Sequence, residues 1–310
     1  MSPAPVQPVL NDLLGVGCRN SRQPRTFCWE LADGTKRDLV YDPYNHRLKI
    51  YRLGPDDLRD ENVRFWKAGL NDADSAYSKF IVYALPGDEP RWVREGFLRE
   101  AIILGYFADG QDAWIWSAFT PGEREIGPRE REHEETVQMA AARPTVKPEL
   151  KEGFTCRPAR LGDSRILSEV LNQVFSDYPT PLDVDTIQEQ IRAGSNLYRL
   201  VFDAQGRLAA AASAEIDHKV RSAELTDCAT LPAYRGHGLM AYILGQLERD
   251  LIRDLGITSQ YTMARADEVG MNCVFSKLGW IYSGRLVNNC RMPNGWESMN
   301  VWCAPPVDAE

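Results

Sequence analysis

The chain has 310 residues, of which 44% are hydrophobic and 26% are charged, and these values are typical of a soluble globular protein with two domains. A formal net charge of -8 argues against general binding to nucleic acid and suits a cationic small substrate. The sequence has no apolar run of about 18 residues and no secretory signal at its start, so we expect no contact with a membrane and a cytoplasmic location.

The cysteines and histidines form no recognisable site in the sequence. Seven cysteines are scattered without a C-x-x-C pair, which favours incidental free thiols over disulfides. The four histidines lack the spacing of metal ligands, so we expect no metal.

The first half of the chain predicts a smaller domain followed by a charged helix. Residues 79–92 have the pattern of a strand and a helix, residues 93–107 that of a helix end, a glycine and a strand, and residues 112–119 that of a closing strand. The segment from Arg129 to Ala142 is charged and then alanine-rich, which predicts a linker helix.

A domain boundary is predicted near residues 143–152, where prolines follow the linker helix, so we expect domains over 1–142 and 153–310. After the boundary, strands and helices alternate as in a mixed α/β protein. The expected elements are a strand at 153–160, a helix at 164–175, a loop at 178–183, a helix at 184–194, a hairpin at 196–217, a strand at 222–230, a helix at 239–255, a strand at 259–266, a helix at 270–279, and strands at 281–292 and 297–305.

The two halves of the chain share a local pattern. Residues 93–107 and 275–289 both contain a helix end, a glycine, an aromatic residue and then a strand. This similarity predicts a tandem of related units. The first half has no counterpart of the arginine-glycine segment at 235–238.

The segment YRGHGLM, residues 234–240, lies between a predicted strand and the longest predicted helix. Gly236 and Gly238 allow a tight turn and the close approach of an anion, because no Cβ is in the way. The N–H groups at the helix start point outward, and the helix dipole is positive there. The segment is therefore either a phosphate-binding nest or an ordinary strand-to-helix turn with a solvated arginine.

This segment resembles the R-x-x-G-x-G/A motif of the GNAT acetyltransferases, with Arg235 and Gly238 at matching positions and Met240 where the family prefers glycine or alanine. The order of predicted elements from 156 to 303 is also similar to that family. The resemblance implies an α/β (α+β) fold with a mixed, mostly antiparallel sheet flanked by helices, preceded here by a smaller degenerate unit of the same kind. It also implies acetyl-CoA as cosubstrate, with these residues as contacts: Cys228, Ala229, Thr230, Arg235, Gly236, His237, Gly238, Leu239 and Met240.

A wider set of motifs resembles the β-lysine N6-acetyltransferases. The set comprises AELTDCATLPAYRGHGL, ARADEVGMN, FSKLGW, VNN and ESMNVW in the second half, and YNHRLKIYR and REAIILGYFADGQDAW in the first. The resemblance therefore spans nearly the whole chain. It implies transfer of an acetyl group from acetyl-CoA to the terminal amine of β-lysine, which gives N6-acetyl-β-lysine, a compatible solute.

An amine attacks a thioester only when it is neutral, and a lysine-type amine has a pKa of about 10.4, so the site needs a base. Glu224 is the candidate, because ELTDCA resembles the E-x-x-x-C-A strand of the histone-acetylating branch, whose leading glutamate is the base; an exposed strand carboxylate is the alternative. Because successive residues of a strand point to opposite faces, we expect Asp227 on the face of the sheet opposite to Glu224. There it either contacts substrate or anchors a loop.

The general acid that many family members have is missing from its usual place. Those proteins have a tyrosine three residues before L-G-F on the last helix, and Phe275 stands there in this chain. Water, Tyr261 or Cys273 are the alternatives for protonating the leaving thiolate.

Four further residues are candidates for contact with the substrate. Arg265 either holds the substrate carboxylate in a two-pronged contact or forms a surface salt bridge. Tyr178, in a loop stiffened by prolines, either walls the substrate cleft or packs in the core. Asn272 and Glu297 are polar residues in apolar surroundings, and either the substrate or local capping supplies their partners.

Two other functions remain open from the sequence alone. The first is an N-acetyltransferase that acts on another small amine or on a protein lysine. The second is a non-catalytic module that binds acyl-CoA. A homodimer is compatible with the sequence, which does not set the oligomeric state.

Overall fold

The computed structural model describes residues 23–31, 33–71, 75–122, 124–175, 181–292 and 295–306. The chain divides into two compact units, the first drawn from residues 1–100 and 114–127 and the second from 101–113 and 128–310. The predicted linker helix is present as α4 (Glu130–Ala141). It belongs to the second compact unit, whereas the sequence-based division at residue 142 assigned it to the first domain.

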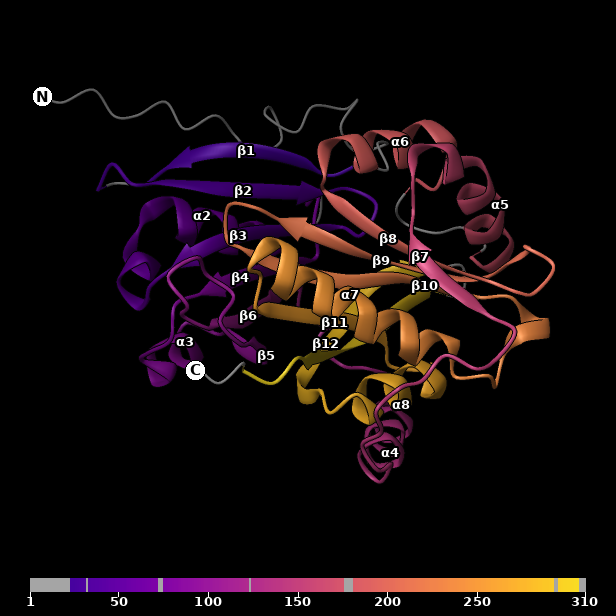
Figure 1. Cartoon of the computed structure of the whole chain (residues 1–310). Helices are drawn as coiled ribbons and strands as arrows, with labels where there is room; N and C mark the ends of the chain where they lie inside the picture. Colours follow the sequence, from indigo (N-terminus) through magenta and orange to yellow (C-terminus); the bar gives the residue numbers. More distant parts are fainter. Residues whose placement is uncertain are drawn as a thin grey trace, which may run out of the picture. The chain divides into compact units, whose positions relative to one another are not determined.

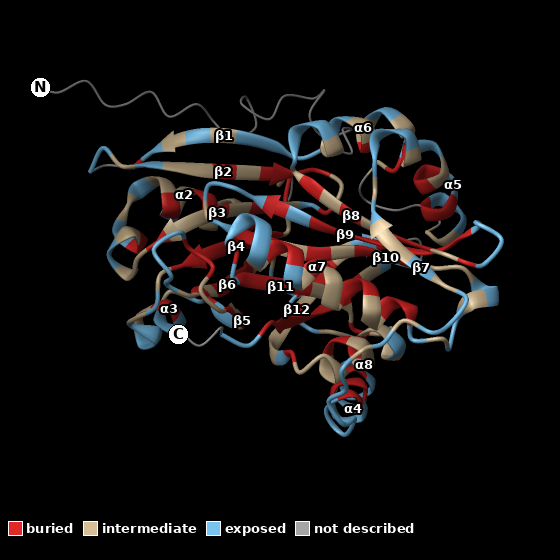
Figure 2. Ribbon diagram, viewed as in Figure 1, coloured by how far each residue is buried: buried red, intermediate tan, exposed pale blue. Residues whose placement is uncertain are grey.

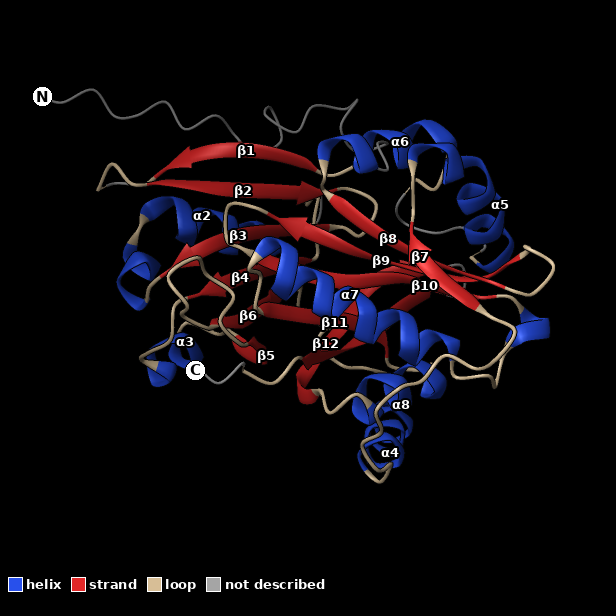
Figure 3. Cartoon of the chain, viewed as in Figure 1, coloured by secondary structure: helices blue, strands red, loops and turns tan. Residues whose placement is uncertain are grey.

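The first unit is built on a six-stranded sheet with the strand order β1-β2-β3-β4-β6-β5. Strands β3 and β4 run parallel, while β1–β2, β2–β3 and β4–β6 are antiparallel pairs. Figure 3 shows these strands in red with the short helices in blue. The elements are β1 (Arg25–Glu30), β2 (Lys36–Asp42), β3 (Arg47–Leu53), η1 (Pro55–Arg59), α2 (Glu61–Ala68), η2 (Gly69–Asn71), β4 (Lys79–Ala84), α3 (Glu89–Arg94), β5 (Leu98–Ile103) and β6 (Ala113–Phe119).

Aromatic side chains fill the interior of the first unit. Trp92 and Trp116 stack with their ring centroids 5.5 Å apart, and Trp66 packs edge-on against Phe80. One ion pair is also buried there, since Lys79 Nζ lies 2.8 Å from Glu100 Oε2. Burial lowers the pKa of Lys79 to about 8, although the charge of Glu100 opposes this shift.

The second unit is built on a seven-stranded sheet with the order β12-β13-β11-β10-β9-β8-β7, in which only β10 and β11 pair in parallel. After α4 its elements are β7 (Thr155–Pro158), η3 (Leu161–Asp163), α5 (Ser164–Val174), α6 (Val184–Ala193), β8 (Asn196–Phe202), β9 (Leu208–Asp217), β10 (Ser222–Thr230), η4 (Pro232–Tyr234), α7 (Leu239–Leu255), β11 (Ser259–Arg265), α8 (Val269–Lys277), β12 (Ile281–Met292) and β13 (Gly295–Cys303).

Helices cover both faces of this second sheet. Alternate residues of β9 face opposite sides, and the alanines at 210, 212 and 214 pack in one cluster with the apolar stripe of α7 and with α8. Ala211 packs in a second cluster with α5 and α6. Figure 2 shows the resulting buried residues along β9, β10 and β11 and on α7. The face that carries α5 and α6 is called here the α5/α6 face.

Helix α4 and the segment after it pack against α8 and α7. Ser276 Oγ of α8 donates a hydrogen bond of 2.7 Å to the carbonyl of Ala140, and the Val146 N–H donates one of 2.8 Å to the carbonyl of Lys277. Figure 1 shows α4 next to α8. The α4 helix is therefore part of the structure that supports α8.

The fold class predicted from the sequence is confirmed, since both sheets are mixed, mostly antiparallel and flanked by helices. Apart from η2, which has no counterpart, the two units repeat one order of elements: β1-β2-β3-η1-α2-β4-α3-β5-β6 in the first corresponds to β8-β9-β10-η4-α7-β11-α8-β12-β13 in the second. Residues 93–107 and 275–289 thus occupy equivalent places, as the tandem pattern predicted. Among the described residues, no helix is long and apolar enough to cross a membrane.

Candidate active site

The parallel strands β10 and β11 separate partway along their length. They pair at three positions only, Ser222 with Ser259, Ala223 with Gln260 and Glu224 with Tyr261. At the point of separation, Thr262 Oγ1 donates a hydrogen bond of 2.8 Å to the carbonyl of Leu225. Beyond it, the described register contains no pairing between residues 226–230 and β11. The separation leaves backbone groups at the end of β10 available to an extended ligand.

A β-bulge marks the same part of β10. The pairing of β10 with β9 shifts between Thr226 and Ala229, and Asp227 has a φ of +50°. Aspartate tolerates this left-handed conformation better than most residues, and a bulge bends a strand and increases its twist. Ser213 Oγ of β9 donates a hydrogen bond of 2.7 Å to Asp227 Oδ2. The bulge therefore lies in the part of β10 that no longer pairs with β11.

The arginine-glycine segment adopts the geometry that an anion site requires. Gly236 and Gly238 have φ angles of +80° and +75°, and a Cβ at either position would meet no atom within 4 Å. Gly238 is the N-cap of α7, and no side chain caps this helix. The N–H groups of the first turn are thus directed at open space, where the helix dipole favours negative charge.

Neighbouring elements hold the segment in place. Tyr234 donates a hydrogen bond of 2.6 Å from its hydroxyl to Asp203 Oδ2, and Asp203 also accepts from the backbone N–H groups of Gln205 and Arg207. The bond from Tyr234 is the main reason that the pKa of Asp203 is far below its usual range. His237 Nδ1 lies 3.1 Å from the carbonyls of Tyr234 and Arg235, so its ring also supports the turn.

Glu224 and Asp227 lie on one face of the sheet. Ala223 and Leu225 pack with α7, so Glu224 between them points to the α5/α6 face. Asp227 reaches that face too, because it accepts a hydrogen bond from Ser213, which lies between Ala212 and Ala214 on β9 and therefore points away from α7. The sequence-based prediction of opposite faces was wrong, because the bulge breaks the regular alternation of β10.

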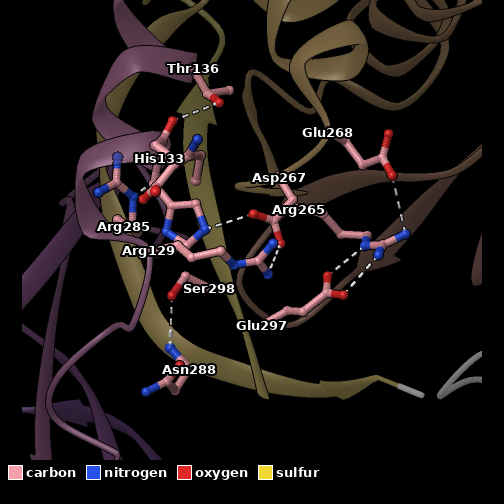
Figure 4. Close-up of polar contacts among 12 residues, drawn as sticks. Arg129, His133, Thr136, Arg265, Asp267, Glu268, Arg285, Asn288, Glu297 and Ser298 are labelled. Atoms are coloured by element: carbon pink, nitrogen blue, oxygen red, sulfur yellow. Dashed lines mark hydrogen bonds and ion pairs between the residues drawn. The ribbon is translucent and has the colours of Figure 1, made fainter. Parts of the chain in front are cut away.

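Arg265, at the end of β11, is already paired in the structure. Its Nε and Nη2 donate hydrogen bonds of 2.6 and 2.8 Å to the two oxygens of Glu297, and its Nη1 lies 3.4 Å from Glu268 Oε1. The bond to Glu297 is the main cause that raises the pKa of Arg265. The two-pronged edge expected to hold a substrate carboxylate is thus occupied by Glu297 (Figure 4).

Asn272, also expected to contact substrate, has used its full hydrogen-bonding capacity. Its Nδ2 donates to the carbonyls of Arg265 and Glu268, each at 3.0 Å, and its Oδ1 accepts from Asn300 and Trp302, each at 2.9 Å. Of the two sequence-based alternatives for Asn272, local capping is the one that these contacts support, because no polar group is left for a ligand.

Three aromatic residues were considered for the general acid or for the wall of the substrate cleft. Phe275 is buried against Trp280, with ring centroids 4.9 Å apart, so the usual position of the acid carries no hydroxyl. Tyr261 lies opposite Glu224 in the register, and its ring packs edge-on against Tyr106. Tyr178 lies outside the described residues.

Several residues that shape the site are not recognisable from the sequence. Ser213, Asp203 and Glu268 are separated from their partners by 14, 31 and 3 positions, and nothing in the local pattern marks them. Arg129 and His133 of the α4 region bind Asp267, and the latter contact is 2.9 Å long. Within the described ranges, no group of histidine, cysteine and acidic residues could hold a metal ion.

The sequence of this chain is similar to those of several known proteins. The profile of the Acetyltransferase (GNAT) family matches residues 165–280. The β-lysine N6-acetyltransferase of Methanosarcina mazei is 36% identical over 249 residues, which cover 73% of this chain and 90% of that protein. The N-acetyltransferase YodP of Bacillus subtilis is 32% identical over 273 residues, or 88% of this chain and 97% of that protein.

Two further proteins are also similar to this chain. The β-lysine N6-acetyltransferase of Methanococcus maripaludis is 30% identical over 266 residues, which cover 83% of this chain and 92% of that protein. Among solved structures, the spermidine N-acetyltransferase of Vibrio cholerae in complex with CoA and spermine is 18% identical, covers 50% of this chain and 96% of its own, and has a TM-score of 0.43.

Proposed function

Because the chain belongs to the GNAT acetyltransferases and is an acetyltransferase, we propose that it transfers the acetyl group of acetyl-CoA to the N6 amine of β-lysine. The observation that carries the choice of β-lysine is the similarity to two curated β-lysine N6-acetyltransferases, which this chain covers over 90% and 92% of their lengths. The geometry supports the reaction class, since a glycine turn suited to an anion and an open strand edge lie next to the half-buried Glu224 and the buried Asp227.

Acetyl-CoA fits the residues at the separation of β10 and β11. The N–H groups of Gly236 to Met240 would hold the pyrophosphate, with Arg235 beside them as a solvent-exposed cation. The pantetheine arm would pair with the backbone of Cys228, Ala229 and Thr230, where β11 has moved away. Met240 keeps the backbone N–H that the motif needs, so its larger side chain does not remove this contact.

Glu224 is the proposed general base. Its carboxylate is half-buried on the α5/α6 face, opposite Tyr261 and at the point where the two strands separate. An amine with a pKa of about 10.4 is almost entirely charged at neutral pH, so it must give up a proton before it attacks the thioester. Asp227, buried and held by Ser213, would bind or orient the charged acceptor rather than accept the proton.

The substrate carboxylate is proposed to bind at Arg265. Glu297 binds two of the guanidinium nitrogens, Nε and Nη2, so Nη1 is the nitrogen that a ligand can reach. Glu297 thereby orients Arg265 instead of touching substrate itself. Tyr178 remains a proposed wall of the cleft. The product, N6-acetyl-β-lysine, is proposed to serve as a compatible solute in the cytoplasm, and a homodimer remains the proposed assembly.

The site of acetylation tests this proposal directly. The full chain would be incubated with acetyl-CoA and β-lysine, and the product would be analysed by tandem mass spectrometry to locate the acetyl group. We expect one acetyl group, on N6 and not on the 3-amino group. No product with β-lysine, alongside turnover of another amine, would reject the proposed substrate.

A further inference from the structure

Arg265 contacts two carboxylates in two unequal ways. Glu297 accepts short hydrogen bonds of 2.6 and 2.8 Å, and only 6% of its side chain is exposed. Glu268 lies 3.4 Å from Nη1, and 53% of its side chain is exposed. A short bidentate contact that is shielded from water is strong, whereas a long contact between exposed groups is weak. Figure 4 shows the two glutamates approaching the guanidinium from different sides.

The backbone at Glu268 is held by hydrogen bonds, whereas the Glu268 carboxylate is exposed and has one long contact with Arg265. Asn272 Nδ2 binds the carbonyls of Arg265 and Glu268 at 3.0 Å each. Between these two residues, Asp267 is held by Arg129 and by His133 Nε2, the latter at 2.9 Å (Figure 4). The Glu268 carboxylate can therefore turn away from Arg265 without any change in the loop.

The remaining contacts make Nη1 the exchangeable position. Removing Glu297 from Arg265 would leave a buried carboxylate without its cation, which is costly. Removing Glu268 would only return an exposed carboxylate to water, at little cost. Within the part of the chain that the structure describes, Arg265 is the one ion-pair partner of Glu268.

We propose that Glu268 is a placeholder for the substrate carboxylate. In this inference, which rests on the proposed function, the carboxylate of β-lysine replaces Glu268 at Nη1 while Glu297 keeps the guanidinium in its orientation. A substrate with a carboxylate must compete with Glu268, and a diamine without one meets no such competition. Glu268 therefore sets how strongly the enzyme distinguishes β-lysine from a simple diamine.

The test is the Glu268→Gln variant of the full chain, with acetyl-CoA saturating. We expect the KM for β-lysine to fall by about two- to fivefold, the range that an exposed ion pair supplies, with kcat unchanged. The KM for cadaverine, which has no carboxylate, should stay the same or rise. Glu132→Gln is the matched control, because it removes the same charge from an exposed position on α4 and should change neither KM.

Three outcomes would overturn the inference. These are an unchanged or higher KM for β-lysine in Glu268→Gln, an equal fall in KM for cadaverine, or an equal effect of Glu132→Gln. The proposed function fails separately, if the wild-type chain does not acetylate β-lysine at all. A wild type that acetylates β-lysine together with any of the three outcomes rejects only the role of Glu268.

Discussion

The two halves of this protein share an order of elements but differ at their parallel strands. In the first unit, β3 and β4 pair at six positions, from Arg47 with Lys79 to Leu53 with Ala84, and Leu85 then donates to the Leu53 carbonyl at 2.8 Å. In the second, β10 and β11 pair at three positions and separate. The strand edge that would hold pantetheine is thus already hydrogen-bonded in the first unit and open in the second.

The loops after these strands differ in charge as well. After β3 the chain continues as Gly54-Pro55-Asp56-Asp57, and the two aspartates stand in the first turn of η1, where they repel a phosphate. After β10 it continues through Arg235, Gly236 and Gly238 into the 17 residues of α7. The same topology therefore meets the requirements of the proposed cofactor site only in the second unit, where the strands separate and the first turn of α7 has no acidic residue.

One strand of each parallel pair, β3 and β10, nevertheless contains a bulge. The register of β3 with β4 shifts next to Arg52, which has a φ of +63°, and that of β10 with β9 shifts at Asp227, which has a φ of +50°. A bulge alone is thus not enough to separate two strands. In the first unit, β3 contains a bulge but stays paired with β4, and aromatic side chains and the Lys79–Glu100 ion pair fill the interior.

Breaking the buried pair of the first unit should have the largest effect on stability. Lys79→Met leaves Glu100 buried without its cation, and we expect the free energy of unfolding to fall by about 3–5 kcal/mol. Arg265→Ala should cost less, about 2 kcal/mol, because Arg265 is 38% exposed. Urea denaturation followed by tryptophan fluorescence measures both, and equal losses would contradict the comparison.

The same pair should make stability depend on pH. Burial lowers the pKa of Lys79 from 10.5 to about 8 in the folded protein. Between these values the unfolded chain binds the proton and the folded chain does not, so stability should rise as the pH increases from about 8 to 10.5. Lys79→Met/Glu100→Gln should lack this rise in urea titrations at several pH values. A rise of the same size in the double variant would exclude Lys79 as its source.

The glycine loop should be essential for binding acetyl-CoA in the second unit alone. Gly238→Val forces a branched side chain into a φ of +75° and into the space left for the phosphates, so we expect affinity to fall by at least about a hundredfold. Gly54→Ala is the control in the first unit, because Gly54 has an ordinary φ of -94°. Isothermal titration calorimetry should detect no change for Gly54→Ala, and retained binding in Gly238→Val would reject the site.

Replacing Glu224, the proposed base, should lower the rate of turnover and leave the binding of acetyl-CoA unchanged. Glu224→Gln is expected to lower kcat by about a hundredfold at pH 7.5 and to leave the affinity for acetyl-CoA unchanged. Lys49→Gln is a control on the parallel strand β3 of the first unit and should leave kcat unchanged. Release of the CoA thiol measures both variants. Near wild-type turnover in Glu224→Gln would move the role of base to Asp227 or to water.

The hydrogen bond that holds the bulge should contribute the smallest effect. Ser213→Ala removes the donor to Asp227, and we expect a loss of about 1 kcal/mol in the free energy of unfolding. Asp227 would then be less well oriented, so the KM for β-lysine should rise by a few fold with kcat little changed. Urea denaturation and steady-state kinetics test the two parts. An unchanged KM would exclude Asp227 from acceptor binding.

Local patterns were sufficient to predict the elements of the second half of the chain and the tight turn before α7. The spacing of apolar residues predicted α7 from Leu239 to Leu255, and the glycines of YRGHGLM predicted a tight turn, where the structure has Gly236 and Gly238 at positive φ. The acceptor side was less predictable, because its contacts join residues that are far apart in sequence. The pairing of Arg265 with Glu297 spans 32 positions, and the orientation of Asp227 depends on a bulge that regular alternation does not reveal.

The most direct test of the proposed function is the kcat/KM of the full chain for a panel of amines with acetyl-CoA saturating. The panel would contain β-lysine, α-lysine, cadaverine and spermidine, with release of the CoA thiol as the signal. We predict that β-lysine is preferred, that α-lysine is intermediate because it keeps a carboxylate, and that cadaverine and spermidine are poor because they have none for Arg265. A higher kcat/KM for cadaverine or spermidine than for β-lysine would contradict the account.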